Sequence, residues 1–496
     1  MIVLGILYIL CLLGLAVYGM NSLWLTGLYL RSRNVQTKLP AVNQELHPLP
    51  RVTVQLPIYN ERYTIQRLLE AVTHLDYPAD RLQIQVLDDS NDSTAHLVRK
   101  LVARYQAKGI DIQLIQRNDR SGYKAGALAE GLKTATGELI AVFDADFVPA
   151  PDWLRRCLPE FSDPRLGCLQ TRWGHLNRNY NPLTQAQALG IDGHFVIEQT
   201  ARSRNGLFLN FNGTAGIWRR AAIETSGGWQ CDTLTEDLDL SYRAQLNGWR
   251  IGYLPDVVVP AELPAQVEAL KKQQFRWAKG TMQTVRKLLP KLIRADISWK
   301  VRLEGIIHLT GYLVHPLMLF TLLLTLPVAL FDPSLQKYFT WTGVIAFGPP
   351  LLYSLARTEE TPRLTDRLRM LPMLFLLGFG LSLNNTQAVI EGLFKRGGQF
   401  ARTPKFNLRN RDGAWMEGAY ATQTVHVAWG EVFLAMYAAA TIALLWPIQG
   451  WAPIPWMISY VCGYSFMTIM SIVQSFQVRR VRPKAARQTD SSLYPM

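Results

Sequence analysis

Carboxylate side chains in two short segments have the types and spacing to do chemistry together. Asp144 and Asp146 lie one residue apart, so their carboxylates can hold a hard cation against a diphosphate. Asp237, preceded by Thr235 and Glu236, adds a carboxylate that can take the proton from an acceptor hydroxyl.

A basic and aromatic segment follows these acids and contains Gln273, Arg276 and Trp277. The Arg276 guanidinium can neutralise a departing diphosphate, and the flat face of Trp277 can seat a sugar ring. Together with the acids, these are the parts that a metal-dependent nucleotide-sugar transferase needs.

The same residues also have plainer interpretations. Asp144 and Asp146 can be solvated loop acids, and Thr235 can cap a helix that begins at about Asp237, where acids suit the helix dipole. Arg and Trp also collect at membrane interfaces. The order along the chain favours a site, because acids at strand ends are followed by acids at a helix start and then by Arg-Trp just before apolar spans.

The composition is an average over unlike parts. The chain has 496 residues, and neither residues 1–30 nor residues 432–478 contain a charged side chain. The net charge of +14 fits cationic cytoplasmic loops of a membrane protein better than nucleic-acid binding. The five cysteines have no metal-binding spacing, which is typical of inert thiols in a reducing compartment.

Short aliphatic runs alternate with helical segments after residue 50. Strands are predicted over 52–56, 82–87, 112–115 and 139–143, with helices such as 62–73 and 93–106 between them. This alternation predicts a parallel sheet covered by helices on both faces, with ligands beyond the carboxyl ends of the strands.

The apolar segments predict an integral membrane protein. Spans are expected over 1–30, 305–331, 338–356, 432–446 and 454–478, with the N-terminus outside and the catalytic domain and C-terminus in the cytoplasm. Residues 371–394 lie between two basic loops and are expected to be interfacial or re-entrant. The expected division of the chain is a span (1–30), a catalytic domain (31–285), an amphipathic interface helix (286–304), two spans (305–356), an interfacial helix with a loop (357–427), two spans (428–478) and a basic tail (479–496).

Several motifs resemble those of membrane-integrated family 2 glycosyltransferases, the group that contains cellulose, hyaluronan and chitin synthases. The chain looks most like plant cellulose-synthase-like A and C proteins, which make mannan or glucan backbones. The matching stretches cover about residues 50–285 and are Gln55-Leu-Pro-Ile-Tyr-Asn-Glu61, Gln85-Val-Leu-Asp-Asp-Ser90, Gly122-Tyr-Lys-Ala-Gly-Ala127, Phe143-Asp-Ala-Asp-Phe147, Phe211-Asn-Gly-Thr-Ala-Gly216, Thr235-Glu-Asp237 and Gln273-x-x-Arg-Trp277.

The resemblance implies an α/β catalytic domain of the GT-A type inserted between transmembrane helices, and a role for each matching residue. Asp237 is expected to be the general base, and Asp144 and Asp146 are expected to hold Mg²⁺ or Mn²⁺ with the diphosphate. The stretch Phe400-Ala-Arg-Thr-Pro-Lys405 resembles a gating-loop motif that closes over the nucleotide, with Arg402 where the motif has Val. The expected substrate contacts are Asp88, Asp89, Lys124, Glu236, Gln273, Arg276, Trp277, Phe400, Thr403 and Lys405.

Three functions compete at this point. The first is an inverting, processive transferase that polymerises hexose from UDP-glucose or GDP-mannose into a β-1,4-linked polysaccharide and moves it across the membrane. The second adds a single β-hexose to ceramide or diacylglycerol, and the third is a transporter or structural protein that only binds nucleotide. The third has no need of a base at Asp237. The expected partners are the donor, a glycan or lipid acceptor and membrane lipids, in a plasma (inner) or Golgi-like membrane.

Overall fold

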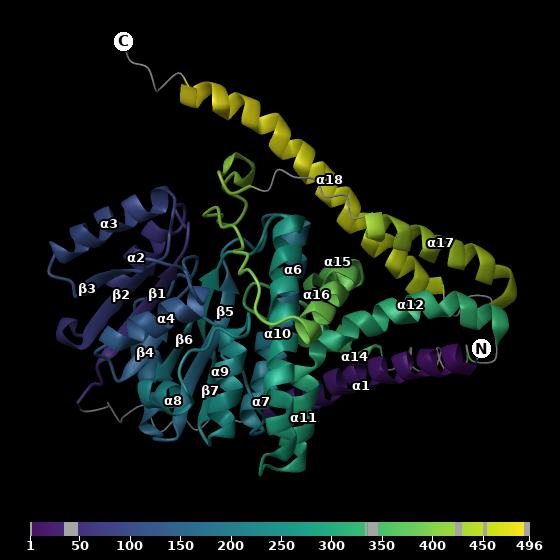
Figure 1. Ribbon diagram of the computed structural model, residues 1–496, viewed down its shortest axis with the longest axis horizontal. Helices are drawn as coiled ribbons and strands as arrows, with labels where there is room; N and C mark the ends of the chain where they lie inside the picture. Colours follow the sequence, from purple (N-terminus) through teal and green to yellow (C-terminus); the bar gives the residue numbers. More distant parts are fainter. Residues whose placement is uncertain are drawn as a thin grey trace.

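A seven-stranded mixed sheet organises the first half of the chain (Figure 1). The computed structural model describes residues 2–33, 48–332, 335, 346–421, 429–449 and 454–490. The strand order is β3-β2-β1-β4-β6-β5-β7. The strands are β1 (Val52–Ile58), β2 (Leu82–Asp88), β3 (Ile112–Gln116), β4 (Leu139–Val142), β5 (Leu166–His175), β6 (Gly216–Arg219) and β7 (Arg250–Ala261).

The predicted four-stranded parallel unit is present, but the whole sheet is mixed. Strands β1 to β4 pair in parallel, whereas β6 runs antiparallel to both β4 and β5. Strand β6 begins opposite the end of β4, because Gly216 pairs with Val142, so the loop before β6 lies at the carboxyl edge of β4. The GT-A-type α/β prediction holds.

Helices cover both faces of this sheet, as predicted. Side chains alternate across each strand, so Ala141 and Phe143 face α2, α3 and α5, while Ile140 and Trp218 face α4, α8 and α9. The helices of this domain are α2 (Ile65–Thr73), α3 (Ser93–Gln106), α4 (Tyr123–Thr134), α5 (Trp153–Cys157), α6 (Pro182–Asp192), a π-helical turn (Gly193–Gln199), α7 (Thr200–Arg204), α8 (Arg220–Thr225) and α9 (Glu236–Leu246). Short 3₁₀ turns lie at Ala79–Arg81 and Leu158–Ser162.

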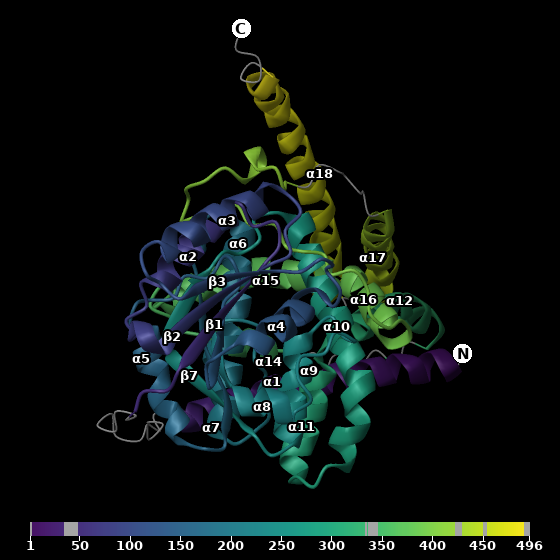
Figure 2. The same cartoon turned by 60° about the vertical axis from the view of Figure 1, so that its left-hand side comes forward.

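The remaining helices lie to one side of the sheet domain in Figure 1, whereas in the turned view of Figure 2 several of them, including α1, α14 and α15, overlap it. They are α1 (Ile2–Ser32), α10 (Val267–Arg294), α11 (Trp299–Leu309), α12 (Val314–Phe331), α14 (Gly348–Leu355), α15 (Leu364–Gly380), α16 (Ser382–Phe394), α17 (Trp429–Gln449) and α18 (Ile454–Asp490), with 3₁₀ turns at Gly311–Leu313 and Trp415–Glu417.

Four helices are long and apolar enough to cross a membrane, at 2–32, 311–331, 429–447 and 454–481. They correspond to four of the five predicted spans. The fifth, 338–356, falls in part on residues 338–345, which lie outside the described residues, and its described part contains the eight-residue α14. Helices α15 and α16 meet at a bend of 46°, so this pair is a broken span or a re-entrant element, and its interfacial position stays a prediction.

Residues 286–304 do not form one amphipathic helix. The 28-residue α10 continues to Arg294, the chain breaks, and Ser298 caps the start of α11 by accepting a hydrogen bond from the Val301 backbone N–H. Apolar residues of α10 pack on those of α11, for example Leu292 on Leu309, which explains the apolar pattern that the sequence shows there.

The strap, residues 395–421, connects α16 toward α17 and crosses over the sheet domain (Figure 1). It contains almost no regular structure. The rest of the predicted loop, residues 422–427, lies outside the described residues.

Candidate active site

The two aspartates after β4 each face a lysine. Lys124 Nζ lies 2.5 Å from Asp144 Oδ1 and also donates to the Gly213 carbonyl at 2.9 Å. Lys405 Nζ, from the strap, lies 2.7 Å from Asp146 Oδ2, and that oxygen also accepts a hydrogen bond from the Glu262 backbone N–H. The Asp144 side chain is 36% exposed, whereas that of Asp146 is 7% exposed, so the two carboxylates differ in access.

Asp237 lies directly against the loop that precedes β6. A Cβ atom on Gly213 would lie 2.8 Å from Asp237 Oδ2, and Gly213 has φ +83°, so only glycine fits there. The hydroxyl of the next residue, Thr214, accepts a hydrogen bond from the Asp144 backbone N–H at 2.9 Å. One loop therefore contacts both the expected base and the first expected metal ligand.

Helix α9 begins at Glu236, close to the predicted start, but Thr235 does not cap it through its side chain. The Thr235 hydroxyl lies 3.2 Å from that of Thr284 on α10 instead. The two helices approach closely at this point, because a Cβ on Gly280 would lie 2.7 Å from Thr235 Cγ2. The capping prediction is wrong, since contact with α10 turns the hydroxyl away from the helix start.

Burial governs the charges of these acids. It raises the pKa of Asp237, and with the neighbouring Asp237 charge it raises the pKa of Glu236 to about 7. For Lys124, burial alone would lower the pKa, but Asp144, Glu236 and Asp237 raise it above its ordinary value. A lysine ammonium therefore persists beside three carboxyl groups.

Helix α10 brings Arg276 to the same place. Burial lowers the Arg276 pKa, while the charges of Glu236, Asp237 and Asp144 oppose that effect. The Arg276 guanidinium lies 4.3 Å from the centroid of the Phe400 ring, which stacks on Tyr123 at a centroid distance of 6.0 Å. The structure thus brings the motif on α10 and the predicted gating motif together.

Asp89 has an ion-pair partner that the sequence analysis missed. Arg117, just after β3, binds both Asp89 oxygens, and its guanidinium also donates to the carbonyls of Ser121 and Tyr123. Asp88 accepts from the Ser90 N–H and from Gln116, each at 3.0 Å, so both of its oxygens have protein donors. In the sequence, Asp89 follows the end of β2 and Arg117 follows the end of β3, and this pattern could have predicted the ion pair.

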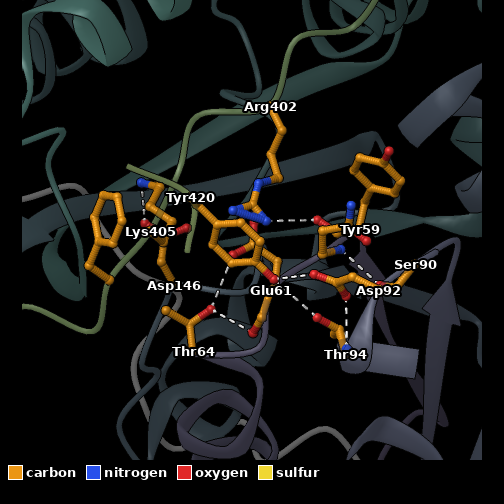
Figure 3. A network of polar contacts seen from close by, with 12 residues as sticks. Tyr59, Glu61, Thr64, Ser90, Asp92, Thr94, Asp146, Arg402, Lys405 and Tyr420 are labelled. Atoms are coloured by element: carbon orange, nitrogen blue, oxygen red, sulfur yellow. Dashed lines mark hydrogen bonds and ion pairs between the residues drawn. The ribbon is translucent and has the colours of Figure 1, made fainter. Parts of the chain in front are cut away.

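The strap is fastened across the carboxyl edge of the sheet by buried acids (Figure 3). Glu262, after β7, accepts hydrogen bonds from the backbone N–H groups of Phe406 at 2.7 Å and Leu408 at 3.0 Å. Arg402 donates to the Tyr59 carbonyl at 3.1 Å and lies 3.7 Å from Glu61, whose pKa burial raises to about 8. Farther along, the Tyr420 hydroxyl binds Asp92 at the start of α3 (Figure 3). The motif identified the strap, but nothing in the sequence identified these anchors.

Three buried polar atoms around the strap have no hydrogen-bond partner among the described residues: Arg276 Nε, Arg402 Nη2 and Thr403 Oγ1. Buried polar groups are normally paired, so orphaned donors beside a cleft are typical of a polar ligand site. All three belong to residues in or next to the predicted substrate-binding motifs.

The aspartates fit a divalent cation that shares its ligands with a substrate. No group of three or more His, Cys, Asp or Glu side chains in the described part of the chain could hold a metal by itself. Mg²⁺-type cations are commonly held by one or two carboxylates, substrate phosphates and water. Asp144 and Asp146 match that donor set, and the two lysine ammonium groups show that the site favours positive charge.

A cavity of about 750 Å³ joins this site to the candidate spans. Asp237, Gln273 and Trp277 line its catalytic end, and Tyr18 of α1 and Trp456 of α18 line it among the spans. The wall mixes aromatic rings with polar groups such as His315 and Asn385.

Comparison with known proteins agrees with this geometry. Residues 50–280 match the family model described as glycosyltransferase like family 2. Probable glucomannan 4-beta-mannosyltransferase 11 of Arabidopsis thaliana is 38% identical over 323 residues, which cover 63% of this chain and 72% of that protein. The chain belongs to glycosyltransferase family 2.

The sequence similarity to these relatives covers more residues than the family model, which ends at residue 280. Glucomannan 4-beta-mannosyltransferase 2 of Arabidopsis thaliana is 38% identical over 360 residues, covering 70% of this chain and 66% of that protein, just under two thirds. In fold, the chain resembles the mannosyltransferase PcManGT from Pyrobaculum calidifontis, solved with GDP-Man and Mn²⁺, with TM-score 0.50 and 22% identity over 78% of this chain and 99% of that one.

Proposed function

We propose that this protein is an inverting, processive β-1,4-hexosyltransferase that uses a nucleotide sugar and passes its product between its own spans. The single observation that carries this proposal is the cavity from Asp237 to Trp456. A polymer leaving the base along that path meets aromatic faces and polar groups.

The residues suggest how the reaction proceeds. The acceptor hydroxyl oxygen attacks the anomeric carbon, Asp237 takes the proton, and the bond from that carbon to the diphosphate breaks with its electron pair leaving on the diphosphate. Arg276 and Lys124 oppose the charge that develops there. One displacement without an enzyme nucleophile inverts the anomeric centre, so an α-linked donor gives a β-linked product.

Asp144 and Asp146 are the residues that would hold Mg²⁺ or Mn²⁺, and the cation would supply positive charge to the diphosphate. Asp146 would have to exchange its contact with Lys405, since one oxygen now faces that ammonium. We place the nucleoside beyond the end of β2, next to the Asp89–Arg117 ion pair.

The transferred sugar is proposed from the relatives, which are named for 4-beta-mannosyl transfer. Mannose from GDP-mannose is therefore the first donor to test, and UDP-glucose the second. Purified protein in lipid should convert one of these labelled donors into material that elutes as polymer and that a β-1,4-specific mannanase or glucanase digests.

The second candidate, single transfer to a lipid, makes a different product. Labelled material that extracts into organic solvent and resists both hydrolases would support the lipid acceptor and reject the polymer. The membrane itself, plasma (inner) or Golgi-like, and the cytoplasmic placement of the catalytic domain remain part of this proposal and are tested by protease protection in sealed vesicles.

A further inference from the structure

A π-helical turn, Gly193–Gln199, forms part of the wall of the large cavity. Single π turns widen a helix and occur frequently at functional sites. This one packs against α14, because a Cβ on Gly193 would collide with the ring of Tyr353. The turn is therefore held in place from behind, and His194 and Glu198 on it line the cavity.

These two side chains form a chain of hydrogen bonds with Asn212. His194 Nδ1 lies 3.0 Å from Glu198 Oε2, and His194 Nε2 lies 3.1 Å from Asn212 Oδ1. Asn210 Nδ2 also donates to Asn212 Oδ1, at 2.9 Å. Burial would raise the pKa of Glu198, but the hydrogen bond and charge of His194 lower it below its ordinary value, so the carboxylate is ionised at neutral pH.

The chain of bonds ends beside the expected base. Asn212 precedes Gly213, where an added Cβ would lie 2.8 Å from Asp237 Oδ2. The side chains of His194 and Glu198 are 28% and 29% exposed, and because both line the cavity, this exposed surface is available to a molecule inside it. Asp89 and the strap, which we assign to the donor, lie along the carboxyl edge of the sheet instead.

We propose that Glu198 and His194 form a subsite for the acceptor glycan and bind hydroxyl groups of its terminal sugar. This inference rests on the proposed function. A carboxylate accepts hydrogen bonds from neighbouring sugar hydroxyls, and the imidazole beside it orients that carboxylate and offers a second polar contact. Trp277, on the same cavity, supplies an apolar face for the ring. The subsite would hold the attacking hydroxyl toward Asp237.

The competing explanation is structural, since the pair also fastens the π turn to the loop at 210–212. A purely structural role would disturb donor and acceptor steps together, because that loop also contacts Asp144 through Thr214. An acceptor subsite affects the acceptor alone.

The test compares Glu198→Gln and His194→Gln with the wild type in lipid nanodiscs, using labelled GDP-mannose or UDP-glucose and a soluble β-1,4-linked tetrasaccharide of the same sugar. We expect the KM for the tetrasaccharide to rise on the order of tenfold, as for loss of a hydrogen bond to a charged group. The KM for donor and the rate of donor hydrolysis by water should stay unchanged. His74→Gln is the control, because His74, directly after α2, is exposed and is not among the residues that line the cavity.

Equal KM values for the tetrasaccharide in wild type and variants, or a parallel loss of donor hydrolysis, would overturn the subsite. Glu198→Gln keeps the shape of the side chain. It therefore still tests the subsite if the His194→Gln variant does not fold. A wild type that elongates no acceptor from either donor would instead count against the proposed function itself.

Discussion

Asp237, the general base in our proposal, has a raised pKa and lies against the loop that precedes β6. Burial raises its pKa, and Lys124 and Arg276 limit the rise. The Gly213 backbone lies so close to Asp237 that a side chain there would displace the carboxylate.

Replacing the base tests this role directly. We expect Asp237→Asn to bind donor normally yet lose transfer by about two to four decades, the usual contribution of a positioned proton acceptor. Asp237 can accept a proton only while its carboxylate is ionised. Because its pKa is raised, wild-type kcat should fall with decreasing pH already at a pH above about 3.9, the ordinary pKa of Asp. Near-wild-type turnover in the variant would assign the proton to another group.

The ion pair between Asp146 and Lys405 leads to a second prediction, on metal binding. An ammonium 2.7 Å from a carboxylate opposes a cation at the same oxygen. Without nucleotide, Lys405→Met should therefore bind Mn²⁺ more tightly than wild type, by about tenfold or ~1.4 kcal/mol, while Asp146→Asn binds it more weakly. Calorimetric titration measures both.

Lys395→Met provides the control for that titration, because Lys395 is exposed and pairs only with Glu391 on α16 among the contacts of the described residues. If Lys405→Met and Lys395→Met bind Mn²⁺ equally, Lys405 does not compete for the metal site.

The strap is held by polar contacts and by one apolar cluster, in which Leu408 and Trp415 pack with Ala265 and Val478. Its polar anchors include the backbone hydrogen bonds to Glu262, the Lys405–Asp146 ion pair, the Arg402 contacts and the Tyr420 hydroxyl. Such contacts exchange readily with water, so an element of this kind can open and close more easily than a helix packed in a core.

If the strap closes over the nucleotide, its uncharged residues matter to catalysis. Phe400→Ala removes the contact with Arg276, and Thr403→Ala removes an orphaned hydroxyl. We expect each variant to lower activity about tenfold, equivalent to ~1.4 kcal/mol, with unchanged membrane association. Protease cleavage near Arg402 should fall when nucleotide and metal are added.

Equal cleavage with and without nucleotide, together with full activity of both variants, would favour a different role for the strap. Its cations would then serve as contacts to anionic lipid, each contributing on the order of 1 kcal/mol.

Elements with a strong local pattern were predictable from the sequence, and contacts between distant residues were not. The strands β1 to β4 are continuous aliphatic runs, and α3 ends where predicted, at Gln106. The four-residue β6 has too little pattern to detect, although it makes the sheet mixed. Family motifs identified the candidate residues, but the lysines facing Asp144 and Asp146 and the acids under the strap depend on tertiary structure alone.

At the scale of the whole molecule, the cavity links catalysis to the spans. Trp456 and Tyr460 of α18 line it at one side, and Phe379 of α15 packs edge-on to Tyr460 with ring centroids 4.7 Å apart. These rings form a wall against which a sugar polymer can slide without strong directional bonds.

Removing one ring should therefore affect product length more than the chemical step. We expect Trp456→Ala to release shorter polymers, seen by size-exclusion chromatography, with the initial rate of donor consumption unchanged. Trp446→Ala on α17 is the matched control, since Trp446 is half exposed and is not among the residues lining the cavity. Identical length distributions in the two variants would argue against the cavity as the product path.

The cavity wall takes side chains from both ends of the sequence, Leu12 and Tyr18 near its start and Trp456 and Tyr460 near its end. Chains fold from the N-terminus as they leave the ribosome, so the catalytic domain can be complete while α18 is still being made. At that stage the cavity lacks the wall that α18 forms. If the cavity is the product path, as we propose, polymer export has to wait until α17 and α18 have been inserted into the membrane.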